Sequence, residues 1–469
     1  MARPDRGRSA SAAGRFARTI LLAALAGGGA HLPLLHADDA LSAPACPVRA
    51  PASGASAGKL SALIYACFGS AAAELRFRDE TLDRLTVLAR LATTESSGER
   101  RALFQSLEPV WRSIDGDGDE TSPWRALNRL HITQLQSGDG TLASRAAALG
   151  VDPAQVEPWL VAVLQAWRDA LADQDLEPWD FYFHTGAMER ALAGHLPLEA
   201  LRPLNDRVYR DLGADPSQLG IEYDIAPRAG KDPVAFTDFV TRQRQLPDGT
   251  WAPGRFRVSA TYAAGGAGNF AELLHETGHA IHIAAIRAPP GLSDWPDSDI
   301  FTEALADLIA LDVYDPAWQQ HYLGDPVPAA DALRAKYAVI VMDVAWALFE
   351  LRMQADPERD PNAVWTGIMQ QYLRIRPHPE WSWWAMRGQL VSGPGGMLNY
   401  ALGAILCADL RARTRELFGQ QPWGDTTWYA RVAERLFRFG LERPSRRVIE
   451  DYLGRPVTPD ALLAELRAR

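Results

Sequence analysis

The sequence is poor in lysine and cysteine, and no segment is dominated by one charge sign. Only three of its 469 residues are lysine, and 58 acidic against 48 basic side chains give a net charge of -10. Because nucleic-acid phosphates are bound by clustered cations, we expect no nucleic-acid partner. Three cysteines cannot form a disulfide framework, although Cys46 and Cys67 could form one bridge.

Long apolar runs are also scarce. The composition, 47% hydrophobic and 23% charged, is that of an ordinary globular protein. An apolar stretch from Thr19 to Ala26 follows five arginines and precedes small residues up to Ala37. This pattern predicts a signal peptide over residues 1–37, and therefore export to the periplasm or secretion. A membrane anchor is the alternative, but a spanning helix needs about 20 apolar residues, so we expect no stable membrane association.

The rest of the chain is expected to be a short linker and one folded domain. Residues 38–57 are rich in Ala, Pro and Ser and predict a flexible linker. Apolar residues at helical spacing predict a helical lobe over residues 58–215. Residues 221–225 and 255–261 alternate as strands do, with a turn at 247–249 between them, and helices resume after Asn269. The second lobe is therefore expected over residues 216–469.

The segment His275-Glu276-Thr-Gly-His279 carries the clearest chemical signal. Two histidines four residues apart on a helix project from one face, so both imidazoles can reach one metal ion. Glu276 then lies beside the open side of that ion, a layout typical of zinc hydrolases. The alternative is a surface helix with a solvated histidine pair.

A zinc site needs a third protein ligand. In the metzincin pattern it would be a histidine ten residues after the first, where this chain has Ala285. Glu303 is the only glutamate between residues 277 and 349 and is the candidate. Asp307, one helical turn later, is expected to receive a histidine N–H and fix its tautomer, with a solvated helix charge as its alternative. His282 is expected to lie in the core or beside the ligands.

These residues resemble a known group of peptidases. The run 273–282, followed by Phe301-Thr-Glu-Ala-Leu-Ala-Asp-Leu-Ile-Ala-Leu311, resembles the gluzincin peptidases of the angiotensin-converting-enzyme and thimet oligopeptidase/oligoendopeptidase families. Residues 221–231 are similar to a strand and turn that thimet-type enzymes carry upstream of the zinc helix. Residues 392–403 are similar to the glycine-containing loop that leads, in these families, into a helix bearing a tyrosine, which here is Tyr400.

The resemblance implies a mostly α-helical fold with two lobes around a deep channel and a small edge β-sheet beside the zinc helix. It implies one Zn²⁺ per chain, held by His275, His279 and Glu303, with Glu276 as general base. Tyr400 would donate to the oxyanion, and a purely structural buried tyrosine is the alternative. Because a channel between lobes excludes folded chains, the expected partners are short or unfolded peptides.

Substrate contacts are expected in two places. The strand over residues 255–261 precedes the zinc helix, and its backbone at Ser259 and Ala260 could pair with an extended peptide. Gly395 and Gly396 lie in the loop before the family's tyrosine.

The resemblance is incomplete. Met397 and Asn399 stand where the dipeptide-releasing enzymes have a tyrosine and a chloride-binding arginine, so dipeptide release and chloride activation are not implied. His378 is the nearest candidate for an additional transition-state histidine. A strict exopeptidase and a catalytically silent peptide-binding protein stay open as alternatives, and the sequence predicts no oligomeric state.

Two other patterns are interpreted as structural. Residues 115–120 resemble the opening of a calcium loop, but Ala126 stands where a bidentate glutamate is needed, so we predict a polar turn capping the helix after Pro123. Trp381, Trp383 and Trp384 are expected to pack a core rather than line a channel.

Overall fold

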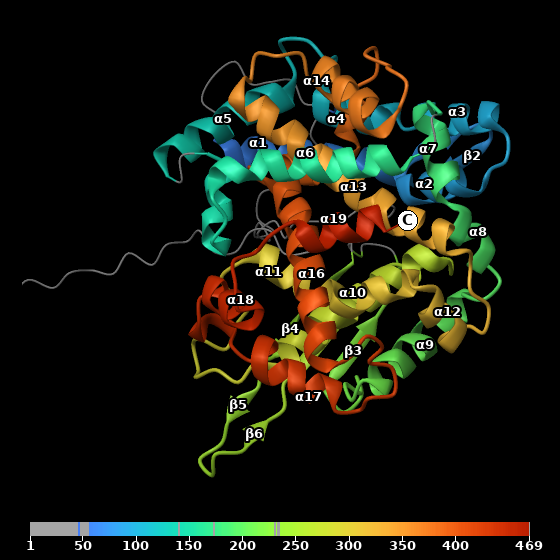
Figure 1. The fold of residues 1–469 in the computed structure, drawn as a ribbon. Coiled ribbons are helices and arrows are strands. Elements are labelled where there is room, and N and C mark those ends of the chain that lie inside the picture. The colour runs from blue at the N-terminus through green and yellow to red at the C-terminus, as the bar shows by residue number, and fades with distance from the viewer. Residues whose placement is uncertain are drawn as a thin grey trace, which may run out of the picture.

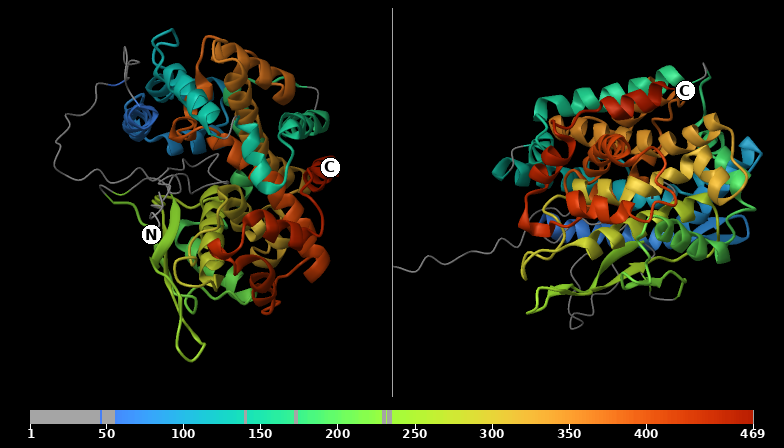
Figure 2. Two further views of the ribbon diagram at one scale, coloured as in Figure 1. Left: turned by 90° about the vertical axis from the view of Figure 1, so that its left-hand side faces the viewer. Right: turned by 60° about the horizontal axis from the view of Figure 1, so that its bottom comes forward.

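The computed structural model describes residues 46, 56–138, 141–171, 174–228, 231 and 235–468. The predicted signal peptide and nearly all of the predicted linker lie outside these residues. The described chain is mostly helical, with two lobes and small sheets, as predicted (Figures 1 and 2). Cys46 and Cys67, whose pairing the sequence leaves open, form a disulfide, which ties Cys46 to the first helix.

One lobe, the upper in Figure 1, contains most of the early helices and part of the later chain. Its elements are α1 (Ala57–Ala73), β1 (Leu75–Phe77), β2 (Glu80–Leu82), α2 (Arg84–Thr93), α3 (Ser97–Gln105), α4 (Glu108–Asp115), α5 (Pro123–Ser137), α6 (Pro153–Ala170), α7 (Pro178–Thr185), α13 (Ala329–Ala355), α14 (Pro361–Ile368) and α15 (Gln389–Ser392). Helices from both sides of residue 215 therefore share this lobe.

The other lobe holds the main sheet and most of the later helices. Its elements are α9 (Leu198–Asp211), β3 (Ile221–Asp224), β4 (Phe236–Thr241), β5 (Arg244–Gln245), β6 (Trp251–Ala252), β7 (Arg255–Ser259), α10 (Ala267–Ala285), α11 (Asp299–Ala310), α12 (Pro316–Tyr322), α16 (Gly396–Phe418), α17 (Trp428–Val432) and α18 (Ser445–Leu453). At the side lies α8 (Ala187–Leu192).

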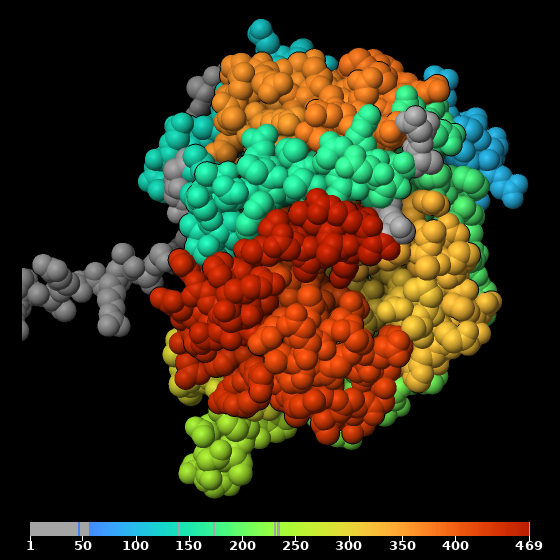
Figure 3. Space-filling view, in the orientation of Figure 1, coloured from blue at the N-terminus to red at the C-terminus, as the bar shows by residue number. Residues whose placement is uncertain are grey.

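Two elements join the lobes. α13 is buried along most of its length, because it packs against α6 on one side and α16 on the other. α19 (Asp460–Arg467) also contacts both α6 and α16, and Figure 3 shows it covering their junction.

The polar segment 115–120 behaves as predicted. The Ser122 hydroxyl accepts from the Arg125 N–H at the start of α5, and it donates to Asp115 Oδ1 at 2.8 Å. Asp115 Oδ2 accepts from the Ser382 hydroxyl at 2.6 Å. The Asp115 carboxylate therefore accepts hydrogen bonds from the residue that caps α5 and from the loop that carries Ser382.

The tryptophans after residue 380 belong mainly to the core, as predicted. Trp383 and Trp384 are buried, and Trp384 packs against Trp124 and Phe349 with ring centroids 4.6 and 5.1 Å apart. Trp381 is half-buried and packs on Phe104 at 6.1 Å. Such aromatic packing stabilises the upper lobe.

The main sheet has the strand order β3-β7-β4, with β3 parallel and β4 antiparallel to β7. Both predicted strands are confirmed, but the turn at 247–249 does not join them. It lies between β5 and β6, which form a separate antiparallel pair.

The expectation that substrate pairs with the backbone at Ser259 and Ala260 is wrong. β7 is the central strand, and Ser259 is already opposite Asp224 on one side and Phe236 on the other. The Ala260 N–H donates to the Asp224 carbonyl at 2.9 Å. The edges left for pairing are β3 and β4.

Within the described part of the chain, no helix combines the length and apolarity that crossing a membrane requires.

Candidate metal centre

The helix α10 carries His275, Glu276 and His279, and almost every one of its residues is buried. Side chains from neighbouring elements donate to its backbone carbonyls. The hydroxyls of Tyr209 and Tyr429 donate to the carbonyls of Leu274 and Ile281, and the Thr237 hydroxyl shares its one hydrogen between the carbonyl and Oε2 of Glu276. Because these donors come from three different elements, α10 is fixed against α9, the sheet and α17.

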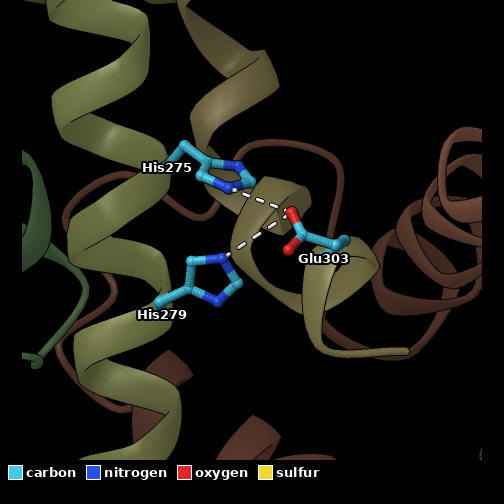
Figure 4. Close-up of side chains that lie close together, drawn as sticks. All are labelled: His275, His279 and Glu303. Atoms are coloured by element: carbon cyan, nitrogen blue, oxygen red, sulfur yellow. Dashed lines mark ion pairs between the residues drawn. The ribbon is translucent and has the colours of Figure 1, made fainter. Parts of the chain in front are cut away.

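Close packing of α10 on α11 brings the third candidate ligand into place. A Cβ atom at Gly278 would lie only 2.3 Å from the carbonyl oxygen of Ala306. Glycine in the fourth position of the motif therefore lets the α11 backbone cross directly against α10. Glu303, almost one turn before Ala306, consequently faces the two histidines (Figure 4).

His275, His279 and Glu303 converge as the sequence predicts. One potential ligand atom from each lies within 4.8 Å of the others. Glu303 Oε2 is 3.4 Å from His275 Nε2 and 3.7 Å from His279 Nε2 (Figure 4). All three residues are at most 3% exposed.

Asp307 holds the ring of His275, as predicted. Its Oδ1 is 2.7 Å from His275 Nδ1, so Nδ1 carries a proton, and Nε2 is the nitrogen that faces Glu303 and would bind an ion. Burial lowers the pKa of His275, but Asp307 and Glu303 together raise it well above its usual value. Burial raises the pKa of Glu303, and the two histidines bring it down to about 2.

The donor set fits a divalent cation. His275 Nε2 and His279 Nε2 are buried and accept no hydrogen bond from any described residue. Buried polar atoms are rarely left without a partner, and a cation between them and Glu303 would supply one. Two imidazoles and a carboxylate are ligands that zinc accepts.

Glu276 lies beside this cluster and is held by a residue that sequence reasoning missed. The Thr237 hydroxyl is 2.8 Å from Glu276 Oε2, whereas Oε1 is buried without a partner among the described residues. Burial raises the pKa of Glu276 to about 7, against the opposing influence of His279 and His275. Thr237 lies on β4. The sequence could have indicated this strand through the run Phe236-Thr-Asp-Phe-Val-Thr241, which is rich in residues that favour β-strands.

Tyr400 is buried on the second turn of α16, 7% exposed. Burial and then the charge of Glu303 raise its pKa well above the usual value, so the phenol stays protonated. The Arg387 guanidinium carbon lies 5.7 Å from its ring centroid. Tyr400 thus neighbours both the cluster and a buried cation.

The loop residues Gly395 and Gly396 have close neighbours outside the cluster. A Cβ atom at Gly396 would lie 2.5 Å from the Gln389 carbonyl oxygen, and Gly395 has φ +77°. Glu350 accepts from the N–H of the next residue, Met397, at 2.8 Å. These contacts fix the start of α16, and a substrate contact there stays a prediction.

His282 and His378, the two further histidines considered in the sequence analysis, lie in different surroundings from each other. His282 packs against Trp295 and Phe437, and Trp295 in turn lies 5.5 Å from the His279 ring. His378 stacks on Trp381, and its ring nitrogens lie 2.8 Å from Glu380 and 2.9 Å from Glu177. Both nitrogens of His378 are therefore engaged by carboxylates.

No protein-family model and no curated protein sequence matches the chain. The fold is similar to a 3.1 Å X-ray structure of a protein provisionally assigned as an oligoendopeptidase F, with a TM-score of 0.61 and 15% sequence identity. The match covers 87% of this chain and 74% of that one. At this identity, the comparison shows a shared fold.

Proposed function

We propose that the protein is a zinc-dependent metallopeptidase that hydrolyses peptide bonds in short or unfolded peptides. The observation that carries this proposal is the convergence of His275, His279 and Glu303 beside the buried carboxylate of Glu276. The similarity to a protein assigned as an oligoendopeptidase F supports it.

His275, His279 and Glu303 would hold the ion, and Asp307 would keep His275 in the tautomer that a ligand needs. A bound zinc ion supplies Lewis acidity that polarises a peptide carbonyl and lowers the pKa of water. A peptide carbonyl placed at the cluster would therefore lie next to Glu276.

Glu276 would act as the general base. Its Oε1 has no partner among the described residues, while Thr237 holds Oε2 in place. A carboxylate with a pKa near 7 can take a proton from water and return it to the leaving amine at neutral pH.

Tyr400 would donate its phenolic hydrogen to the oxygen that becomes negative during attack. Its raised pKa keeps that hydrogen in place. A single donor of this kind contributes about 3 kcal/mol to the transition state.

The test is mass spectrometry of a mixed peptide set incubated with the zinc-loaded chain. Glu276→Gln should abolish cleavage while zinc stays bound. Glu272→Gln is the matched control, because Glu272 is buried on the same helix and burial also raises its pKa to about 7. It should retain cleavage.

The products decide the subclass. Internal cuts indicate an endopeptidase, and two-residue C-terminal products a peptidyl-dipeptidase. Absence of any zinc-dependent product would contradict the proposal and leave a peptide-binding protein.

We also propose that the chain is exported. The disulfide between Cys46 and Cys67 supports this proposal, since such bonds persist in oxidising compartments.

A further inference from the structure

Glu189 supplies a cap that the helix α10 lacks in its own sequence. The N-cap position is Gly266, which has no side chain to accept a hydrogen bond, and the first turn carries no acidic residue. The first N–H groups of a helix have no acceptor within that helix. Glu189 Oε1 accepts from the Ala267 N–H at 3.2 Å, and Oε2 accepts from the Gly268 N–H at 2.9 Å. One carboxylate from α8 therefore satisfies two N–H groups, at the end where the helix dipole favours an anion.

The chain just before α10 is shaped for this contact. Gly266 has φ +109°, and a Cβ atom there would clash with Glu189 Oε1. A Cβ atom at Gly265 would clash with the Leu196 carbonyl oxygen, which accepts from the Gly266 N–H at 2.8 Å. Two consecutive glycines thus let the backbone approach α8 and the loop after it more closely than larger residues could.

The helix that carries Glu189 is attached to the upper lobe. α8 packs against α2, α7 and α13. The next residue, Arg190, donates through Nη1 to the carbonyls of Ala92 near the end of α2 and of Phe183 on α7, at 2.6 and 2.8 Å. The tyrosine and threonine hydroxyls that contact its carbonyls hold α10 to elements of the lower lobe. Through Glu189, helices of the upper lobe therefore fix the start of α10.

A displaced start of α10 would alter the metal cluster. His275, Glu276 and His279 lie on this helix, and the first of them follows Ala267 by about 12 Å along the axis. Glu303 lies on α11 instead. A shift or tilt of α10 therefore changes the distances between the two histidines and Glu303. Metal–ligand distances tolerate only about 0.2 Å.

We infer that Glu189 is a positioning residue, which holds α10 where its two histidines meet Glu303 and where Glu276 meets the substrate. The consequence for cleavage rests on the proposed function. The consequence for α10 itself does not.

The test compares Glu189→Ala with the control Asp152→Ala. Asp152 caps α6, a helix without cluster residues, by accepting from the Ala154 N–H at 2.9 Å. Chelator competition should show zinc affinity reduced about 2- to 30-fold in Glu189→Ala and unchanged in Asp152→Ala. In the peptide assay, kcat of Glu189→Ala should fall about 10- to 100-fold at nearly constant KM, since the change displaces reacting groups without removing a substrate contact.

Hydrogen exchange of the metal-free proteins separates this inference from the proposed function. Amides in the first turn of α10 should exchange about 2- to 30-fold faster in Glu189→Ala, and Asp152→Ala should leave them unchanged. Glu189→Gln keeps the side-chain volume but loses the charge and one acceptor oxygen. It should change zinc affinity and exchange in the same direction by smaller amounts.

Native exchange rates in α10 of both Glu189 variants would overturn the inference. Faster exchange with native zinc affinity would also overturn it, because the cap would then be purely structural, as would an equal loss of zinc affinity in Asp152→Ala. If the native chain bound no zinc, the proposed function would fail, while the exchange rates would still decide whether Glu189 fixes α10.

Discussion

The contact between α10 and α11 at Gly278 is predicted to set the geometry of the metal cluster. In Gly278→Ala, the new methyl group would meet the Ala306 carbonyl oxygen at 2.3 Å, whereas ordinary contacts begin near 3.4 Å. α11 must therefore retreat by about 1 Å, and Glu303 moves with it. Metal–ligand distances tolerate only about 0.2 Å, so the cation would lose this ligand.

The expected result has two parts. Overpacking of this kind destabilises a core by about 1–3 kcal/mol, and a displaced ligand should weaken zinc binding by at least about 10-fold. Thermal unfolding and chelator competition measure the two effects separately. Gly367→Ala is the control, since no atom lies within 4 Å of its added Cβ and the site is an exposed helix position. Wild-type zinc affinity and stability in Gly278→Ala would refute the reasoning.

Three further changes have defined outcomes. Asp307→Ala removes the partner of His275 Nδ1 and should weaken zinc binding about 10- to 100-fold in chelator competition; unchanged affinity would show that Asp307 has no such role. Thr237→Val removes the donor to Glu276 and should lower kcat about 10-fold, with recovery in Thr237→Ser; equal loss in both variants would argue for a packing effect. Burial raises the pKa of Glu350 to about 8 from 4.5, so its contribution to stability is full below pH 4.5 and is lost as pH rises toward 8. Denaturant unfolding should show this loss, on the order of a few kcal/mol, in the native chain but not in Glu350→Gln, and parallel pH curves would contradict it.

The cluster could be predicted because helical periodicity alone determines most of it. The spacing of His275 and His279 places both on one face, and the same rule relates Glu303 to Asp307. Local sequence also predicted the polar turn before the helix that begins at Pro123, and the two strands that became β3 and β7.

The remainder depends on contacts between distant segments. The alternation that marks β3 and β7 does not say whether they run parallel, and the central position of β7 follows only from its pairing with β4. The sequence likewise gives no sign that α13 and α14 return to the upper lobe.

Metal analysis of the purified chain after reconstitution with zinc tests the central claim most directly. The geometry of His275, His279 and Glu303 predicts one zinc ion per chain, retained in Glu276→Gln and lost in Glu303→Ala. A chain that binds no zinc, or that binds it equally after Glu303→Ala, would contradict the account.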